Sequence, residues 1–136
     1  MDDLKQARTV IDGIVRRDSH YPSQAYEFVS EGVQYTVRQL QRQEKDGQER
    51  HVTGAELVRG ILEFAVARFG FLAPEVFEYW RFRNGRDIGN TVYAMIGANL
   101  LSASPNDRIE DFDGTTDLPA HLRGIIETAG NGGAAS

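Results

Sequence analysis

Apolar side chains recur at helical spacing through most of the chain, and the clearest case lies in residues 54–69. There they follow one another at intervals of three and four residues, which is the period of an α-helix. They are Leu57, Val58, Ile61, Leu62, Phe64, Ala65 and Phe69. Thr53 and Glu56 have the spacing of a capping box at the start, and Gly70 is a typical stop. So wide an apolar arc predicts a helix that neighbours cover on more than one side.

The long helix predicted over residues 23–43 carries apolar side chains on two sides. Tyr21, Phe28 and Tyr35, seven residues apart, form an aromatic stripe next to Gly32. A helix of this kind either lies centrally in its own fold or presents one side to a partner. An intramolecular core is the simpler interpretation. The stripe is nevertheless the first candidate for a dimer surface, because Gly32 permits close backbone approach.

The remaining pattern predicts helices over residues 3–17 and 87–99, and a short helix that Pro74 opens. Asp87 is expected to cap the helix that it begins. The simplest interpretation of residues 101–112 is a short β-hairpin around a proline turn. The sequence therefore predicts a mainly α fold, a single-domain bundle of about five helices with one small hairpin.

Composition separates one domain from an appendage. Residues 1–114 hold most of the predicted helices, and residues 115–129 are interpreted as a loop and a short C-terminal helix. Residues 130–136 have no side chain large enough to bury, so a disordered tail is expected there. A chain of 136 residues can bury a core in one domain without disulfides or metals.

Composition and charge exclude several classes of site. With no cysteine, a disulfide scaffold, a thiol nucleophile and a cysteine-ligated metal site are ruled out. The net charge of −5 is spread evenly, so no segment is basic enough for strong nonspecific attraction to phosphate. No run of about eighteen apolar residues occurs, so we expect no membrane span. The acidic, polar N-terminus does not have the pattern of a secretory signal, and the absence of cysteine is compatible with the cytoplasmic location that we expect.

Nothing in the sequence assembles the parts of an active site. His20, His51 and His121 are far apart, and none has a partner at metal-ligand spacing. The chain contains neither a Gly-x-Ser-x-Gly nucleophile motif nor a phosphate-binding loop. We therefore expect a non-catalytic protein without metal or cofactor. An enzyme is the third hypothesis, and it would require a pocket with a perturbed ionisable group.

Residues 80–86 place three arginines beside Trp80 and Phe82. Such a segment can hold an anion or stack on a nucleic-acid base. The simpler interpretation buries both aromatic residues in the core and pairs the arginines with nearby carboxylates. Those carboxylates are Glu75, Glu78 and Asp87.

The order of predicted elements from residue 54 to residue 112 matches that of a winged-helix domain, with 87–99 as its recognition helix. This gives an alternative function, the binding of nucleic acid. The surface would consist of Arg81, Arg83, Arg86, Asn90, Tyr93 and Arg108. A helix that recognises bases in the major groove usually carries more basic or amide side chains than this one does.

Gly89 and Gly97, four residues on either side of Tyr93, favour close contact with another protein instead. Our leading hypothesis is therefore a non-catalytic protein–protein interaction module that associates with itself or with another protein. Its expected surface comprises Tyr21, Phe28, Gly32, Tyr35, Gly89, Tyr93 and Gly97.

Three segments are distinctive when taken together: residues 21–29, 50–57 and 107–112. The most specific is Arg-His-Val-Thr-Gly-x-Glu-Leu. These segments resemble a family of small uncharacterised proteins described from planctomycetes and verrucomicrobia. The resemblance covers roughly residues 3–114 and implies that they form one unit, with 119–136 appended. The family brings no assigned activity, cofactor or catalytic residue, so the resemblance implies nothing about function.

Overall fold

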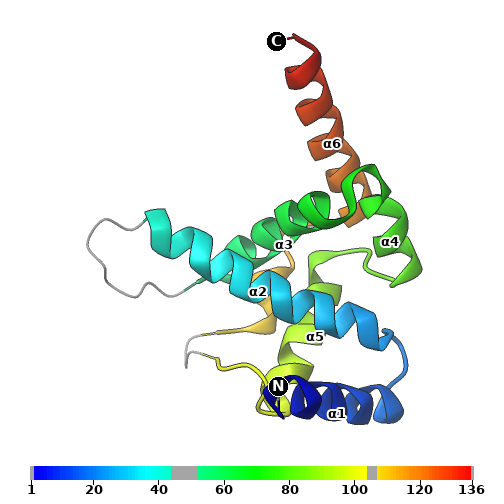
Figure 1. Cartoon of the computed structure of the whole chain (residues 1–136), viewed down its shortest axis with the longest axis vertical. Helices are drawn as coiled ribbons and strands as arrows, with labels where there is room; N and C mark the ends of the chain where they lie inside the picture. The colour runs from blue at the N-terminus through cyan, green and yellow to red at the C-terminus, as the bar shows by residue number, and fades with distance from the viewer. Residues whose placement is uncertain (1, 44–51, 104–106, 136) are drawn as a thin grey trace.

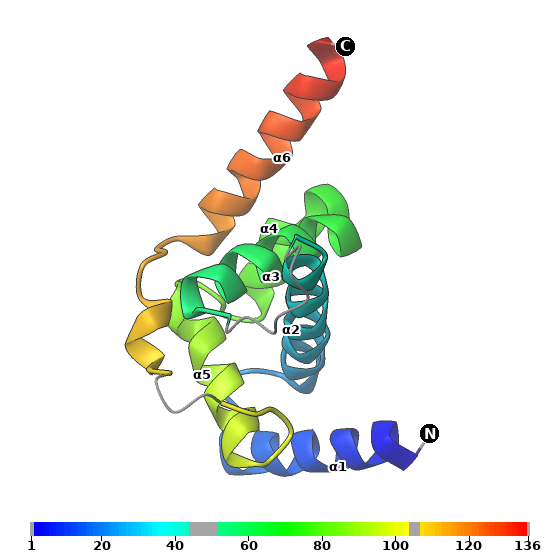
Figure 2. The ribbon, with the colours of Figure 1, turned by 90° about the vertical axis from the view of Figure 1, so that its left-hand side faces the viewer.

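The structure is a computed structural model that describes residues 2–43, 52–103 and 107–135. The described part is mainly helical, as the hydrophobic period predicts. In chain order, its elements are α1 (Asp2–Arg17), α2 (Ser23–Gln43), α3 (Gly54–Phe69), η1 (Gly70–Leu72), α4 (Ala73–Tyr79), α5 (Gly85–Gly97), η2 (Ile109–Phe112) and α6 (Leu118–Ala135). Helix α1 lies across one end of the molecule, and α6 extends from the other end (Figures 1 and 2).

Helix α3 begins and ends where the sequence predicts. The Thr53 hydroxyl accepts a hydrogen bond from the Glu56 N–H at 3.1 Å, and the Thr53 N–H donates to the Glu56 carboxylate at 3.0 Å. At the other end, Gly70 has a φ of 57° and donates its N–H to the Val66 carbonyl. These bonds satisfy backbone groups that a helix end otherwise leaves unpaired.

Helices α2 and α3 pack closely because each brings a glycine to their contact. A Cβ at Gly32 would lie 2.9 Å from Ile61 Cγ1, and a Cβ at Gly60 would overlap the Thr36 side chain. Thr36 is buried, and its hydroxyl donates to the Gly32 carbonyl at 2.8 Å. The two backbones therefore approach more closely than larger residues would allow.

Aromatic rings fill the core beside this contact. The ring centroid of Phe28, on α2, lies 5.2–6.0 Å from those of four other aromatic residues. They are Phe64 and Phe69 of α3, Phe77 of α4, and Trp80 just after α4. Offset and edge-on ring pairs at such distances add to the stabilisation from area burial. The cluster joins α2, α3 and α4 in one core.

The predicted hairpin over residues 101–112 is absent from the part of this segment that the structure describes. Ile109–Phe112 instead form the short helix η2. Its first turn is held by the Arg108 N–H, which donates to the Asp111 carboxylate at 3.2 Å. Aspartate side chains bond nearby backbone groups in this way, in competition with a strand ladder. The predicted turn at 104–106 lies outside the described residues.

The start of α5 also differs in detail from the prediction. Asn84, not Asp87, is the N-cap residue, and Asp87 lies in the first turn. The Asp87 carboxylate accepts the N–H groups of Arg83 and Asn84, each at 2.9 Å. An acidic side chain in the first turn also interacts favourably with the helix dipole.

Helix α6 joins the core through its first turns and then leaves it. Leu118 and Leu122 are fully buried, whereas Ile125 and Ile126 are half-exposed. The helix continues to Ala135, so the backbone of residues 130–135 is helical where the sequence predicts a disordered tail.

The α2–α3 contact predicts opposite effects for two Gly-to-Ala substitutions. We expect Gly60→Ala to lower the free energy of unfolding by about 1–3 kcal/mol, because its methyl group would overlap the buried Thr36. Gly13→Ala is the matched control: a Cβ there meets nothing within 4 Å, so helix propensity should raise stability by about 0.5–1 kcal/mol. Chemical denaturation measures both. Equal effects of the two substitutions would contradict the close contact.

Candidate functional site

The aromatic stripe predicted as a dimer surface lies mostly inside the subunit. Tyr21 and Phe28 are buried, and Ile61 of α3 covers Gly32. Tyr35 is half-buried, with its ring centroid 5.2 Å from that of Phe64. The structure thus corrects the assignment of Tyr21, Phe28 and Gly32 as surface residues, because α3, α4 and α5 surround the side of α2 that carries them.

The stripe predicted on the outer face of α5 is also largely covered. A Cβ at Gly89 would lie 2.9 Å from the ring of Phe112, so η2 occupies that position. Tyr93 is half-buried, with its ring edge-on to Phe112 at 6.2 Å. Gly97 is exposed, and a Cβ there would meet nothing within 4 Å. Of the three, only Gly97 faces solvent.

The polar side chains proposed to read nucleic acid from α5 are engaged by their own chain. Arg86 donates two hydrogen bonds of 2.6 Å to the Asp113 carboxylate, which raise the pKa of Arg86 and lower that of Asp113. The Asn90 amide donates to the Tyr21 hydroxyl at 3.1 Å. Arg108 is exposed at the start of η2. The structure therefore does not gather these residues on one free helical face.

The Tyr21 hydroxyl forms a structural network between the starts of α2 and α5. It donates to the Asp87 carboxylate at 2.6 Å. Burial and this hydrogen bond raise the pKa of Tyr21, so the hydroxyl stays protonated and continues to donate. Nothing in the network has the arrangement of a nucleophile and a base.

Trp80 and Phe82 are core residues, in line with the simpler interpretation of residues 80–86. The arginines between and after them do not form the expected ion pairs. Glu78 pairs instead with Arg123 at 2.7 Å, and Asp87 accepts the hydrogen bonds described above. Within the described residues, neither the Arg81 nor the Arg83 side chain has an ion-pair or hydrogen-bond partner, and both residues are exposed.

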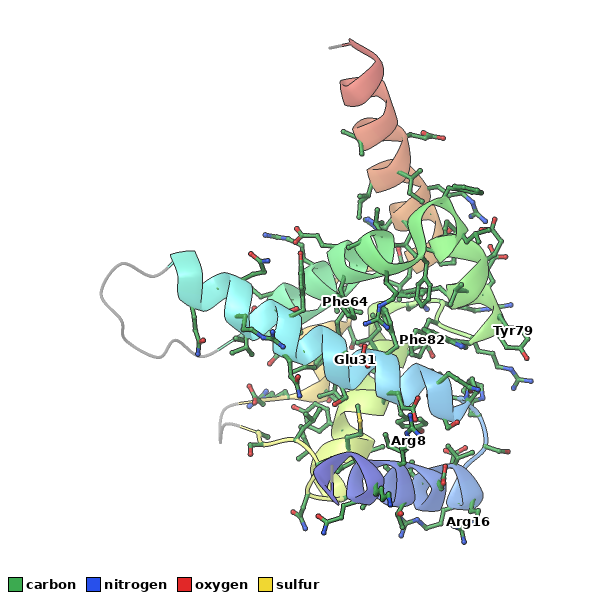
Figure 3. All side chains as sticks on the ribbon, viewed as in Figure 1. Arg8, Arg16, Glu31, Phe64, Tyr79 and Phe82 are labelled. Carbon is green, nitrogen blue, oxygen red and sulfur yellow. The ribbon has the colours of Figure 1, made fainter. Side chains whose placement is uncertain are left out.

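Three large apolar side chains are exposed at the two ends of α4. Phe71 is 77% exposed, Leu72 is 54% exposed and Tyr79 is 81% exposed, and no other large apolar side chain that the structure describes is as exposed. Phe71 and Leu72 lie in η1 directly before α4, and Tyr79 is the last residue of α4. Leu72 and Tyr79 are seven residues apart, a spacing that favours the same side of a helix. Tyr79 stands at the outer edge of the molecule in Figure 3. We call Phe71, Leu72 and Tyr79 the α4 corner.

Sequence reasoning missed the α4 corner. Phe77 and Trp80 turn inward and are buried. Leu72 directly precedes α4 and Tyr79 ends it, and their seven-residue spacing was the available signal.

The α4 corner and the exposed Arg81 and Arg83 offer apolar area and cationic groups for contact with another molecule. Exposed aromatic and aliphatic side chains bury area on contact, and a free guanidinium binds carboxylates. Among the described residues, no three His, Asp or Glu side chains gather as metal ligands. Nor does any described helix combine the length and apolar character needed to cross a membrane.

Comparisons with protein-family models, curated proteins and solved structures give no match for this chain.

The different surroundings of two tyrosines predict different effects of removing their hydroxyls. We expect Tyr21→Phe to lower the free energy of unfolding by about 2 kcal/mol, because the Asp87 carboxylate loses a short hydrogen bond. Tyr79→Phe, at an exposed position, should change it by less than about 0.5 kcal/mol. Urea denaturation measures the difference. If Tyr21→Phe lowers the free energy of unfolding as little as Tyr79→Phe does, the Tyr21 network does not contribute to stability.

Proposed function

We propose that this protein is a non-catalytic, cytoplasmic interaction module that binds an acidic, amphipathic segment of another protein at the α4 corner. The observation that carries the proposal is the exposure of Phe71, Leu72 and Tyr79 at the ends of α4, while the other large apolar side chains that the structure describes are buried or half-buried. Exposed apolar residues that are scattered singly need no explanation, but a group of them on one corner is typical of a contact surface.

The kind of side chain also supports protein binding. Aromatic residues are enriched at the centres of protein interfaces, and tyrosine combines a large apolar ring with a polar hydroxyl. Tyr79 exposes 81% of its surface, and Phe71 exposes 77%. Both can therefore be buried by a partner without rearrangement of the core.

The charge beside the α4 corner selects an acidic partner. Arg81 follows Tyr79 by two residues and Arg83 follows it by four, and neither side chain pairs within the described chain. The protein as a whole carries a net charge of −5, so these unpaired cations stand out against an acidic background. A segment with carboxylates next to apolar side chains would complement both features.

The backbone of Arg81 adds a second argument. Its φ is 67°, in the left-handed region that glycine occupies at least cost. An arginine there is strained by about 1 kcal/mol or more. The Arg81 side chain has no partner in the described chain whose interaction would offset this strain. A salt bridge to a carboxylate of a bound partner would offset it.

Synthetic peptides test the proposal. The probe is a peptide with leucine at every third or fourth position and glutamate between, and the control peptide has lysine in place of glutamate. We expect the acidic peptide to shift the NMR signals of Phe71, Leu72 and Tyr79, and to bind less tightly as salt is added. Equal binding of the lysine peptide, or shifts confined to other regions, would overturn the proposal.

Two measurements separate the other candidate functions. Sedimentation of the protein alone reports self-association: a dimer that Tyr79→Ser dissociates would identify a second copy as the occupant of the α4 corner. Retardation of DNA at low salt, weakened by Arg86→Glu, would support the winged-helix alternative. Either result would replace the acidic-segment proposal.

Substitutions at the α4 corner should separate binding from stability. We expect Tyr79→Ser to weaken binding of the acidic peptide at least about tenfold, with the fold unchanged, because the ring is exposed. Arg81→Gly should weaken binding about threefold while raising the free energy of unfolding by up to about 1 kcal/mol. Arg16→Ser, at an exposed position on α1, is the control and should change neither property (Figure 3). Titration calorimetry and thermal unfolding measure the two effects.

A further inference from the structure

A second candidate site lies between α2, α3, α5 and η2. The cavity there has a volume of about 490 Å³. Its walls are mainly apolar, and their side chains come from four parts of the chain. They include Val33 and Val37 of α2, Leu57 of α3, Val92 and Ile96 of α5, and Leu101. This volume is within the range of small-molecule sites, which are typically apolar concavities with a few polar groups.

Polar side chains also line the cavity. They are Gln41, Tyr93, Ser102, Asp107, Arg108 and Asp111. The Asp111 carboxylate accepts the Arg108 N–H at 3.2 Å, so this carboxylate already has a hydrogen-bond partner. Two carboxylates against one guanidinium leave the lining slightly negative.

The hydroxyl of Tyr93, one of these lining residues, is the unusual polar group. Its oxygen is buried and has no hydrogen-bond partner among the described residues. Burial, followed by the charges of Asp107, Asp111 and Glu110, raises the pKa of Tyr93. The hydroxyl is therefore protonated at neutral pH and offers a donor. A buried polar group without a partner destabilises a protein by roughly 1–3 kcal/mol, so each such group calls for an explanation.

We propose that this cavity binds a small, uncharged amphipathic molecule, whose apolar body lies among the valine, leucine and isoleucine side chains and whose carbonyl or hydroxyl oxygen accepts from Tyr93. The carboxylates of Asp107 and Asp111 disfavour an anionic ligand by repulsion. The slightly negative lining would attract a cation, but an ammonium group cannot accept the Tyr93 hydrogen bond. An uncharged oxygen is the head group that meets both conditions.

This site is independent of the α4 corner. None of Phe71, Leu72 and Tyr79, and neither Arg81 nor Arg83, lines this cavity. A ligand here would not occupy the protein-binding surface, and neither proposal requires the other.

A matched set of naphthalene compounds tests the chemical class. The probes are 2-acetylnaphthalene, which is uncharged and carries an acceptor, 2-naphthoate, 2-naphthylmethylammonium and naphthalene itself. We expect acetylnaphthalene to bind most tightly and to shift the methyl NMR signals of Val37, Leu57 and Ile96. The naphthoate should bind at least about tenfold more weakly. Methyl shifts that are absent, or equal affinities for the ketone and the anion, would overturn the proposal.

The Tyr93→Phe variant tests the role of the hydroxyl. It should weaken acetylnaphthalene about fivefold and leave naphthalene affinity unchanged, because only the ketone accepts a hydrogen bond. Without ligand, this variant should unfold at a higher temperature, on the order of a few degrees, since an unpaired buried hydroxyl has been removed. Tyr35→Phe is the control, because Tyr35 is half-buried but does not line this cavity. Lower stability of Tyr93→Phe, or equal weakening of both compounds, would assign the hydroxyl a structural role and contradict the proposal.

Discussion

The close approach of α2 and α3 is the constraint on which the rest of the structure depends. Gly60 admits Thr36 of the facing helix, and Gly32 admits Ile61. Phe28 then reaches the rings of α3 and α4, so the aromatic core forms directly beside the contact. Helix α4 contributes Phe77 to this core, so its inner face is buried and its outer face is exposed to solvent.

The sequence predicts elements better than it predicts their neighbours. The capping box at Thr53 and the extent of α3 follow from local hydrogen bonding and were predictable, as was the mainly helical fold. The period also identified both apolar sides of α2. It does not say which element covers a side, and that is why the sequence leaves Phe28 a candidate for a dimer surface beside the simpler core interpretation, although α3 and α4 bury it. The hairpin prediction is wrong at residues 109–112 for another reason. Hydrogen bonding by the Asp111 side chain outweighs strand propensity over so short a segment.

The two proposed sites were hidden from the sequence in different ways. Phe71 and Leu72 directly precede α4 and Tyr79 ends it, and the spacing of Leu72 and Tyr79 does not say whether another element covers them. The sequence suggests that Arg81 and Arg83 pair with nearby carboxylates. Glu78 instead forms its ion pair with Arg123, which is distant in the sequence. Tyr93 was recognised as notable, yet only the packing of η2 on α5 reveals the cavity beside it. Long-range contacts decide each of these points.

The only tryptophan of the chain, Trp80, is 7% exposed and lies within 5.2–6.3 Å, between ring centroids, of four phenylalanines. Those neighbours belong to α2, α3, α4 and the segment that follows α4. The indole fluorescence of this protein therefore originates where these elements meet, and its emission wavelength reports whether they are assembled. A single optical signal can follow the folding of the whole core without any label.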